Sequence, residues 1–538
     1  MRGTMMDFPL TLHTILERLG SLYGSIEIVG RRPDRTIERT NYRTIYSRAR
    51  ALAEALQKAG LARGDRVATL MWNHTRHLEA YFGIPAAGGV LHTLNLRLHP
   101  SEIAYIVNHA RDRFLIVDDV LLPTFDSFKS LTQFERVFVV PTCGQSTSHP
   151  HENYEDLLRT ASGRFQYPQL DENEAGAMCF TSGTTGKSKG VVYSHRALVL
   201  HSFALGLRDT FGLGQHDVVL PICPMFHANA WGIPYGAGML GAKMVFTGPH
   251  VDAESVLDLI VSEGVTAAFG VPTVWIGVLA ALEKNPDRWK FKGPVRAPCG
   301  GSAPPEQLMR SLDPFGIHMI HLWGMTETTP IATLGQLRSD MLDWPDDEKF
   351  RIRTSQGVPA PFVEMRIMRP EGAAPHDGKT AGEIEVRGPW VAGSYHEAPE
   401  SANRWTDDGW FRTGDIATID ANGYARIVDR SKDVIKSGGE WISSVDLENA
   451  LMGHPAVREA AVISVPHPRW QERPLAVVVL KEGANATPHD LRSFLGSKFA
   501  KWQIPDAFVF ADEIPRTSVG KFLKLKLREQ YANYQWES

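Results

Sequence analysis

The stretch Phe180-Thr-Ser-Gly-Thr-Thr-Gly-Lys-Ser-Lys-Gly190 contains three glycines, five hydroxyl side chains and two lysines. Glycines let backbone N–H groups approach an anion closely, while hydroxyls and lysines add hydrogen bonds and positive charge. The apolar run Ala177-Met-Cys-Phe180 precedes the stretch, and Val191-Val-Tyr193 follows it. The pattern therefore predicts a polyphosphate-binding loop between two buried strands.

Two other interpretations fit this stretch less well. A Walker A loop ends in Gly-Lys-Ser, as Gly186-Lys187-Ser188 does, but its opening glycine would fall on Thr181. That loop also needs a helix to begin at the lysine, whereas Gly190 and a Val-Val-Tyr run follow here. A flexible linker rich in Gly, Ser and Thr would not be flanked so closely by apolar strands.

The chain has 538 residues, with 57 basic and 61 acidic side chains and a formal net charge of −4. Because there is neither a basic excess nor a basic run, we expect no nucleic-acid partner. The four cysteines show neither metal-site spacing nor a disulfide framework: Cys143, Cys179, Cys223 and Cys299. The N-terminal residues contain no apolar signal core, and no apolar run approaches the ~20 residues needed to cross a bilayer. We therefore expect a cytoplasmic protein without a transmembrane segment.

Between Ala177 and Gly324, short apolar runs alternate with amphipathic segments. Asp252–Ser262 is predicted as a capped helix. Such alternation is typical of a parallel sheet covered by helices, which binds ligands at the carboxyl ends of its strands. We therefore expect the phosphate loop, Gly300–Pro304 and Trp323–Glu327 to converge on one rim. The runs predicted as buried strands are Val218–Leu220, Met244–Phe246, Val265–Phe269 and His318–Leu322.

The pattern changes near Asp429-Arg-Ser-Lys-Asp433, where charged residues cluster. Beyond it, Ala460–Val465 and Leu475–Leu480 are predicted as strands, and a helix is predicted from about Pro488. The predicted fold class is α/β, with a large N-terminal domain of parallel sheets covered by helices and a small, mobile α+β C-terminal domain. The predicted boundaries are 1–428 for the large domain, 429–434 for the hinge and 435–538 for the small domain.

Two further patterns are not interpreted as sites. Gly236-Ala-Gly-Met-Leu-Gly241 matches a dinucleotide-binding fingerprint, but a strand follows it where a helix is needed. We interpret its small residues as a close helix-packing surface. His318 and His321 lie three apart in a predicted strand, so they face opposite sides and cannot readily hold one metal ion.

The loop Thr181–Gly190 resembles the signature loop of the acyl-adenylate-forming superfamily, which contains acyl-CoA synthetases, adenylation domains of peptide synthetases and firefly luciferase. The resemblance covers nearly the whole chain, because further motifs occur in the family's order. It implies that the loop orders over the β- and γ-phosphates of ATP. The loop residues implied to contact ATP are Thr181, Ser182, Gly183, Thr184, Thr185, Gly186 and Lys187.

Two motifs resemble the family's nucleotide site. Trp323-Gly-Met-Thr-Glu-Thr328 resembles its Tyr-Gly-Met-Thr-Glu motif, which implies that the ring stacks on adenine, that Thr326 contacts the α-phosphate region and that Glu327 holds Mg²⁺ together with Thr184. Trp410–Asp415 resembles the ribose-binding motif, in which Asp415 would accept from both ribose hydroxyls. Arg430 would contact ribose or phosphate from beside the hinge. The other residues assigned to this site are Gly301, Ser302, Ala303, Pro304, Trp323, Gly324 and Met325.

Other motifs resemble the acyl, coenzyme A and catalytic segments. Pro224–Trp231 implies that His227 lies near the reacting carboxyl group and Trp231 at the mouth of the acyl tunnel. Leu322 replaces a usual glycine and should narrow that pocket. Ile435–Ile442 resembles the loop of the coenzyme A step. Its assigned residues are Lys436, Gly438, Gly439 and Trp441.

Pro515-Arg-Thr-Ser-Val-Gly-Lys521 resembles the C-terminal catalytic lysine motif, so Lys521 would reach the site only when the small domain closes. The resemblance places the hinge at Lys432 or its neighbours. The residues with implied catalytic roles are Lys521, Glu327, Thr184 and His227.

The resemblance implies an ATP-dependent ligase of a carboxylic acid and coenzyme A, with Mg²⁺ as cofactor. The sequence looks most like bacterial medium- to long-chain fatty-acyl-CoA synthetases, and a homodimer is expected. Trp323 also resembles the CoA ligases of 3-methylmercaptopropionate, and the narrowing expected from Leu322 favours such a short acid. An adenylating enzyme that does not use coenzyme A is a further alternative.

Overall fold

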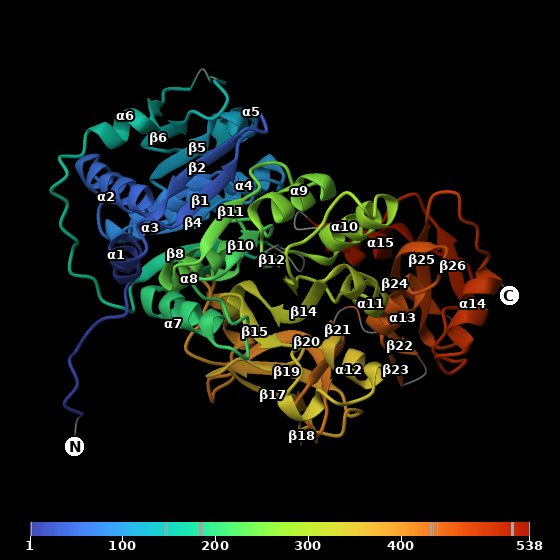
Figure 1. Cartoon of the computed structure of the whole chain (residues 1–538). Helices are drawn as coiled ribbons and strands as arrows, with labels where there is room; N and C mark the ends of the chain where they lie inside the picture. Colours follow the sequence, from blue (N-terminus) through green and yellow to red (C-terminus); the bar gives the residue numbers. More distant parts are fainter. Residues whose placement is uncertain are drawn as a thin grey trace.

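The computed structural model describes residues 1, 3–145, 147, 149–181, 187–430, 433, 435–437, 440–467, 469–517 and 521–536, with only the backbone at 436, 440 and 441. Over these residues the chain forms four β-sheets. Figure 1 shows two large sheets and their helices in blue to yellow, a third sheet in orange below them, and the C-terminal part in red to one side.

The first large sheet has seven strands in the order β7-β6-β5-β3-β4-β8-β9, and all its pairs are parallel except the hairpin β8–β9. Apart from the exposed edge strand β7, short apolar runs form these strands, as expected for a sheet that is covered on both faces. The strands are β3 (Arg66–Leu70), β4 (Val90–Thr93), β5 (Phe114–Asp118), β6 (Arg136–Val140), β7 (Glu152–Asn153), β8 (Ala175–Phe180) and β9 (Gly190–Ser194).

The second large sheet has nine strands in the order β16-β15-β14-β13-β12-β10-β11-β1-β2. Its middle pairs, from β14 to β1, are parallel, and the pairs at its two edges are antiparallel. The strands are β1 (Glu27–Arg31), β2 (Ile37–Asn41), β10 (Val218–Pro221), β11 (Lys243–Phe246), β12 (Ala267–Phe269), β13 (Val295–Cys299), β14 (Ile317–Gly324), β15 (Ile331–Leu334) and β16 (Val358–Pro359).

Alternate residues of these strands pack into different cores, because side chains alternate between the faces of a sheet. In β3, Val67 joins a core between the two large sheets, whereas Ala68 joins a core under α4 and α5. Val29 of β1 joins a third core, under α9 to α11. Helices therefore lie between the sheets and on both outer faces. They are α1 (Leu12–Leu22), α2 (Tyr42–Lys58), α3 (Thr75–Ala86), α7 (His195–Gly206) and α8 (Ile233–Leu240) between the sheets, α4 (Pro100–Ala110), α5 (Leu122–Phe128) and α6 (Tyr154–Arg159) with the first sheet, and α9 (Ala253–Glu263), α10 (Pro272–Lys284) and α11 (Glu306–Leu312) with the second.

The third sheet and the C-terminal part complete the chain. The third sheet is antiparallel, and α12 (Asp346–Arg353) precedes it. The C-terminal part packs α13, α14 and α15 on one mixed sheet. Its two hydrophobic cores consist only of residues after 434. The strands of the third sheet are β17 (Glu364–Arg369), β18 (Gly372–Ala373), β19 (Gly382–Arg387), β20 (Phe411–Ile419) and β21 (Ala425–Arg430). The C-terminal elements are β22 (Ile435–Ser437), β23 (Glu440–Ile442), α13 (Ser444–Met452), β24 (Val457–His467), β25 (Gln471–Leu480), α14 (Pro488–Gly496), β26 (Ala507–Phe510) and α15 (Lys524–Gln530).

The α/β fold class is confirmed, but the expectation that the three polar loops share one sheet is wrong. The phosphate loop joins β8 to β9 in the seven-stranded sheet, whereas Gly300–Pro304 follows β13 and Trp323–Glu327 ends β14 in the nine-stranded sheet. Strand pairing is a long-range choice that the alternation of local patterns does not reveal. The described residues at the two ends of the phosphate loop, Thr181, Lys187 and Lys189, still line one cavity together with Gly301 and Glu327.

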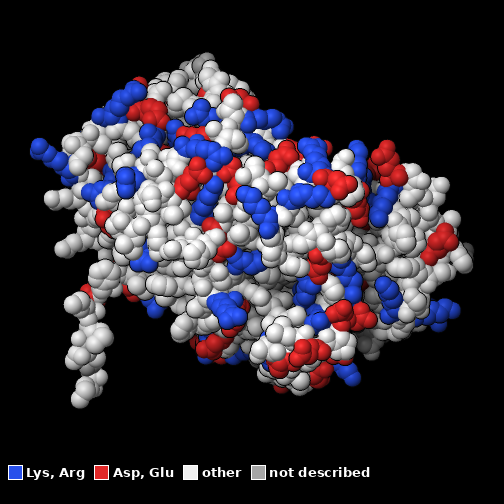
Figure 2. Space-filling model, viewed as in Figure 1, with Lys and Arg blue, Asp and Glu red and all other residues white. Residues whose placement is uncertain are grey.

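The two patterns set aside in the sequence have structural explanations. A Cβ on Gly236 of α8 would lie 2.6 Å from Leu205 of α7, so the glycine permits close helix packing. His318 is exposed and lies 3.1 Å from Asp313, whereas the buried His321 faces the carbonyl of Thr354. Figure 2 shows basic and acidic side chains intermixed over the face that it presents. No described helix is both long and apolar enough to span a membrane.

Candidate active site between the large and small domains

Two adjoining cavities, of about 250 and 160 Å³, lie where the nine-stranded sheet, the third sheet and the C-terminal part meet. The first extends between the large domain and α13 and α15, and the second extends toward the ends of the phosphate loop. The residues that line both cavities are Gly301, Leu322, Gly324, Met325, Arg430 and Lys521. A ligand with two chemically different halves could therefore span the pair.

The first cavity contains an aromatic ring beside a carboxylate. The indole N–H of Trp323 donates to Asp415 Oδ2 at 2.8 Å, and both side chains are buried. Asp415 is paired in register with Arg430 across β20 and β21, and the Arg430 Nε lies 3.4 Å from Asp415 Oδ1. Gly301, Ser302 and Ala303 line the same cavity, whereas Pro304 is buried and its neighbour Pro305 lines it instead.

The second cavity is strongly cationic. Its described lining residues include one carboxylate, that of Glu327. Two hydrogen bonds join the ends of the phosphate loop at this cavity. The Thr181 N–H donates to the Lys189 carbonyl, and the Lys189 N–H donates to Thr181 Oγ1. The cationic side chains that line it are Lys187, Lys189, Arg404, Arg430 and Lys521. This excess of positive charge suits a polyanion.

The backbone after β14 places Glu327 in this cavity. A Cβ on Gly324 would lie 1.7 Å from the carbonyl oxygen of Pro330, so only glycine lets the chain fold back here. The short helix η5 (Thr326–Thr328) follows, and the Tyr395 hydroxyl donates to Glu327 Oε1. Tyr193 donates to the Thr326 carbonyl at 2.8 Å and fixes the same turn from β9.

The Glu327 carboxylate fits a divalent cation. Its Oε2 atom accepts no hydrogen bond from the described residues, while Oε1 is oriented by Tyr395. The described part of the chain holds no group of three or more His, Cys, Asp or Glu side chains that could bind a metal by themselves. Mg²⁺ usually takes only one or two carboxylates beside substrate phosphates, so one free carboxylate oxygen at a phosphate-sized cationic cavity is the expected arrangement.

Lys521 of the C-terminal part reaches both cavities. Its Cε would lie 3.5 Å from a Cβ on Gly301, and the Thr517 N–H donates to the Lys521 carbonyl at 2.7 Å. Burial lowers the pKa of Lys521 to about 8, with a contribution from Arg430 that is opposed by nearby carboxylates. Burial, together with the charge of Lys521, also lowers the pKa of His227 to about 3, so His227 is neutral near pH 7.

The chain at the end of the second cavity adopts an unusual conformation. The residues of η3 (Ala228–Gly232) all have positive φ, between 44° and 74°, although Gly232 is the one glycine among them. Left-handed backbone costs about 1–2 kcal/mol for each non-glycine residue, and such strain concentrates at functional sites. The turn is held by buried contacts, including one from the Cys179 thiol to Asn229 Oδ1 at 2.5 Å.

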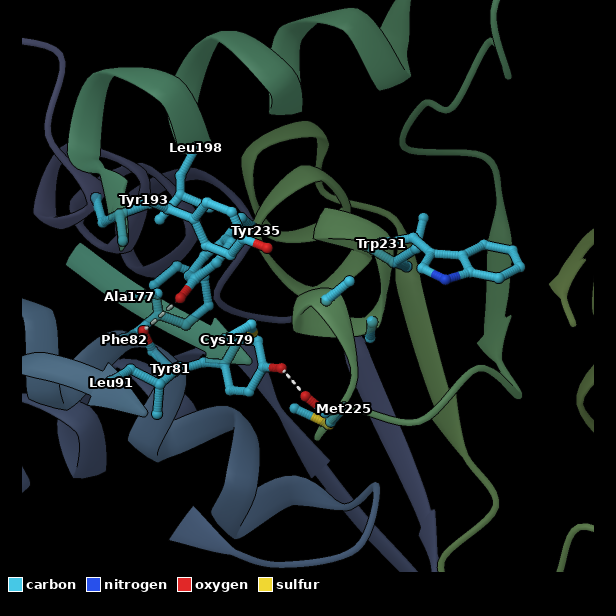
Figure 3. Close-up of a cluster of buried hydrophobic side chains, with 14 of the residues drawn as sticks. Tyr81, Phe82, Leu91, Ala177, Cys179, Tyr193, Leu198, Met225, Trp231 and Tyr235 are labelled. Atoms are coloured by element: carbon cyan, nitrogen blue, oxygen red, sulfur yellow. Dashed lines mark hydrogen bonds between the residues drawn. The ribbon is translucent and has the colours of Figure 1, made fainter. Parts of the chain in front are cut away.

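This turn carries Trp231, whose side chain lines the second cavity. Trp231 and Leu322 line the second cavity and are only 5% and 4% exposed. Figure 3 shows the Trp231 indole directed away from the buried tyrosines Tyr81 and Tyr235, which pack behind the turn. His227 lines the same cavity, and Leu322 also lines the first one.

The structure brings most described candidates together, and some lie outside its described residues. Thr181, Lys187, His227, Met325 and Thr326 line the second cavity. The backbones of Lys436 and Trp441 lie in β22 and β23. The candidates outside the described residues are Ser182, Gly183, Thr184, Thr185, Gly186, Lys432, Gly438 and Gly439.

Among the residues that line the second cavity, Lys189, Tyr395 and Arg404 have functional side chains that were not assigned from the sequence. Lys189 is part of the quoted loop and could have been assigned from its charge alone. Tyr395 and Arg404 lie in an irregular segment between β19 and β20, where no periodic pattern marks a site. Arg404 donates to the Thr413 carbonyl at 2.9 Å and forms no ion pair with a described residue.

Comparison with known proteins now identifies the family. The model of the AMP-binding enzyme family matches residues 26–396, and that of the AMP-binding enzyme C-terminal domain matches residues 446–521. The chain belongs to the AMP-binding enzyme family. Its relatives in the family include AMP-forming acid–thiol ligases, and ATP and coenzyme A are substrates of such enzymes.

Two curated relatives match almost the full length of this AMP-binding enzyme. A long-chain-fatty-acid–CoA ligase of Thermus thermophilus is 49% identical over 99% of this chain and 97% of its own. A 3-methylmercaptopropionyl-CoA ligase of Ruegeria lacuscaerulensis is 44% identical over 99% of both chains. Among solved structures, the anthranilate CoA ligase AuaEII in complex with anthranoyl-AMP is 25% identical, with a TM-score of 0.87 over 97% of this chain and 98% of its own.

Proposed function

We propose that this protein is an ATP-dependent acyl-CoA synthetase that activates a medium- to long-chain fatty acid. In the first half-reaction a carboxylate oxygen attacks the α-phosphorus of ATP, the bond to the β-phosphate breaks, and pyrophosphate leaves. In the second, the coenzyme A sulfur attacks the acyl carbon, the acyl–oxygen bond breaks, and AMP leaves. The observation that carries this proposal is the position of Lys521 between the two cavities, beside Glu327 and His227.

The first half-reaction brings two anions together, so neutralising their charge is the main task. The ammonium of Lys521 lies where the nucleotide half and the phosphate half of ATP would join, because it lines both cavities. His227 remains neutral and can donate a hydrogen bond to the acid without adding a second buried charge. Lys187, Lys189 and Arg404 would bind the leaving pyrophosphate.

The nucleoside would occupy the first cavity. Trp323 would stack on adenine, and Asp415 would accept hydrogen bonds from the ribose hydroxyls. Thr326, at the turn between the cavities, would contact the α-phosphate. Glu327, with Thr184 of the loop, would hold Mg²⁺, which would neutralise phosphate charge and orient the leaving group. The cavity residues Gly301 to Ala303 would form the wall beside the nucleoside.

The second half-reaction needs a different arrangement at the same site. We propose that residues 1–428 and 435–538 act as two domains around a hinge at 429–434 that includes Lys432. Rotation would withdraw Lys521 and bring in the loop that contains Lys436, Gly438, Gly439 and Trp441. The separate cores of the C-terminal part support such a rigid-body motion, because rotation would leave them intact.

The wall of the second cavity bears on which acid the enzyme uses. Trp231 and Leu322 are almost fully buried in the wall of the second cavity, so a fatty acid would need Trp231 to move if its chain is to extend past that wall. The same wall favours a second candidate, a short acid such as 3-methylmercaptopropionate, which would need no such movement. The third candidate function is that of an adenylating enzyme that does not use coenzyme A. Such an enzyme would release pyrophosphate but form no thioester.

One experiment separates these candidates. Pyrophosphate release from ATP is measured with acids of graded length, from three to sixteen carbons, with and without coenzyme A. The proposal expects acid-dependent release and thioester formation, with the highest kcat/KM at medium or long chains. Activity confined to short acids would favour the second candidate, and release without thioester the third. The expectations of a homodimer and a cytoplasmic location stay predictions, and light scattering of the purified chain tests the first.

A further inference from the structure

The bond between Trp323 and Asp415 joins two different sheets. Trp323 lies near the end of β14 in the nine-stranded sheet, and Asp415 lies in β20 of the third sheet (Figure 1). The indole N–H and Asp415 Oδ2 are 2.8 Å apart, and the two residues are 8% and 4% exposed. Because water reaches neither group easily, this bond is worth more than one at the surface.

The other neighbours of Asp415 leave its side chain dependent on this bond. Its backbone N–H donates to Thr413 Oγ1 at 3.1 Å, and Thr413 Oγ1 in turn donates to the Ile384 carbonyl, so the backbone is well held. The carboxylate itself accepts from Trp323 at Oδ2, has Arg430 at 3.4 Å from Oδ1 and is attracted by the charge of Lys521 in the same cavity. At that distance Arg430 attracts the carboxylate but orients it weakly.

The Trp323 ring lies at the border between the buried core and the first cavity. Trp323 lines the first cavity and makes no ring contact with a described aromatic side chain. The N–H lies on the edge of the indole, so the edge can donate a hydrogen bond while another part of the ring lines the cavity. Phenylalanine has no hydrogen-bond donor, and tyrosine carries its hydroxyl at the tip of the ring, so neither residue places a donor where the indole N–H lies.

We infer that Trp323 is a positioning residue, whose indole N–H holds the Asp415 carboxylate in the orientation that reads the ribose hydroxyls. This inference rests on the proposed function, because it takes Asp415 as the ribose ligand. The Trp323 side chain would then serve both parts of the nucleoside. Its face would stack on the base, and its N–H would orient the carboxylate that binds the ribose. Selectivity for ATP over deoxynucleotides would therefore depend on the indole nitrogen of Trp323, an atom that does not itself contact the nucleotide.

The test is the binding of ATP, 2′-deoxyATP and 3′-deoxyATP, measured by calorimetry so that it does not depend on turnover. Trp323→Phe keeps an aromatic face and removes the N–H. A hydrogen bond to a charged group is worth enough to change affinity about tenfold or more. We expect the preference for ATP over each deoxynucleotide to fall about tenfold, with little change in the affinity for the deoxynucleotides.

The chain offers a matched control. Trp289 donates its indole N–H to Asp258 Oδ1 at 2.8 Å and is 5% exposed, but it lines neither cavity. Trp289→Phe should lower the melting temperature and leave the ATP preference unchanged. Trp323→Tyr is the second test variant, and in an Asp415→Asn background Trp323→Phe should have no further effect on the preference.

The outcomes separate this inference from the proposed function. An unchanged preference in folded Trp323→Phe and Trp323→Tyr would overturn the inference, as would equal loss of affinity for all three nucleotides. Wild-type protein that binds ATP and the deoxynucleotides equally would overturn it as well. A wild-type protein that prefers ATP but releases no pyrophosphate with any acid would instead contradict the proposed function, while the variants still decide the inference.

Discussion

The charge state of Lys521 predicts how the first half-reaction depends on pH. Burial and the positive charge of Arg430 lower the pKa of Lys521 to about 8, and Asp415 and Glu327 only partly oppose this shift. The protonated form neutralises the reacting anions, so activity should be lost as pH rises through about 8. With this pKa, about nine-tenths of the ammonium is protonated at pH 7 and about one-tenth at pH 9.

The measurement is kcat/KM for ATP in pyrophosphate release without coenzyme A, because this ratio reports the ionisation of the free enzyme. We expect it to fall about tenfold between pH 7 and pH 9. A lysine with an ordinary pKa would lose less than about a twentieth of its charge over the same range. His227 should not contribute, because its pKa of about 3 lies far below this range.

Lys521→Arg is the control, since a guanidinium keeps its charge at pH 9. Its rate should be lower, because the shape of the group differs, but its profile should be flat from pH 7 to pH 9. A wild-type profile that is flat over this range would refute the reasoning from burial. A profile of Lys521→Arg that falls like that of the wild type would assign the ionisation to another group.

Three further perturbations follow from the same cavities. In a chain-length series, Leu322→Ala should raise kcat/KM for the longest acids about tenfold relative to the shortest. Because Leu322 is buried, the same change should lower the free energy of unfolding by about 2–5 kcal/mol in thermal unfolding. An unchanged chain-length preference would show that Leu322 does not line the acyl site. Tyr395→Phe should raise the Mg²⁺ concentration for half-maximal activity about tenfold, because Glu327 loses its orienting hydroxyl; an unchanged Mg²⁺ dependence would count against Glu327 as a ligand. Arg404→Met should weaken product inhibition by pyrophosphate about tenfold, and unaltered inhibition would remove Arg404 from the phosphate site.

The sequence predicts the parts of the site that lie in short, chemically dense segments. The loop at Thr181–Gly190 and the ends of β14 and β20 could be assigned because glycine, hydroxyl and carboxylate residues occur there at fixed spacing. The four strands and the helix predicted between Val218 and Gly324 correspond to β10, β11, β12, β14 and α9, since burial imposes a period on each element.

The relations between these segments could not be predicted in the same way. Which sheet contains the phosphate loop depends on the pairing of β8 with β4, about eighty residues apart. The Tyr395 hydroxyl on Glu327 and the Trp323 bond to Asp415 likewise depend on how distant segments pack. The left-handed turn at Ala228–Trp231 has no sequence signal, because its non-glycine residues do not favour that conformation.

The central claim is that Lys521 serves the first half-reaction and leaves the site for the second. The most direct measurement compares Lys521→Ala with the wild type in both halves: pyrophosphate release from ATP and acid, and thioester formation from supplied acyl-adenylate and coenzyme A. We predict that the first falls about 10²–10³-fold, the scale of losing one transition-state donor, while the second changes little. Equal losses in the two halves would contradict the account.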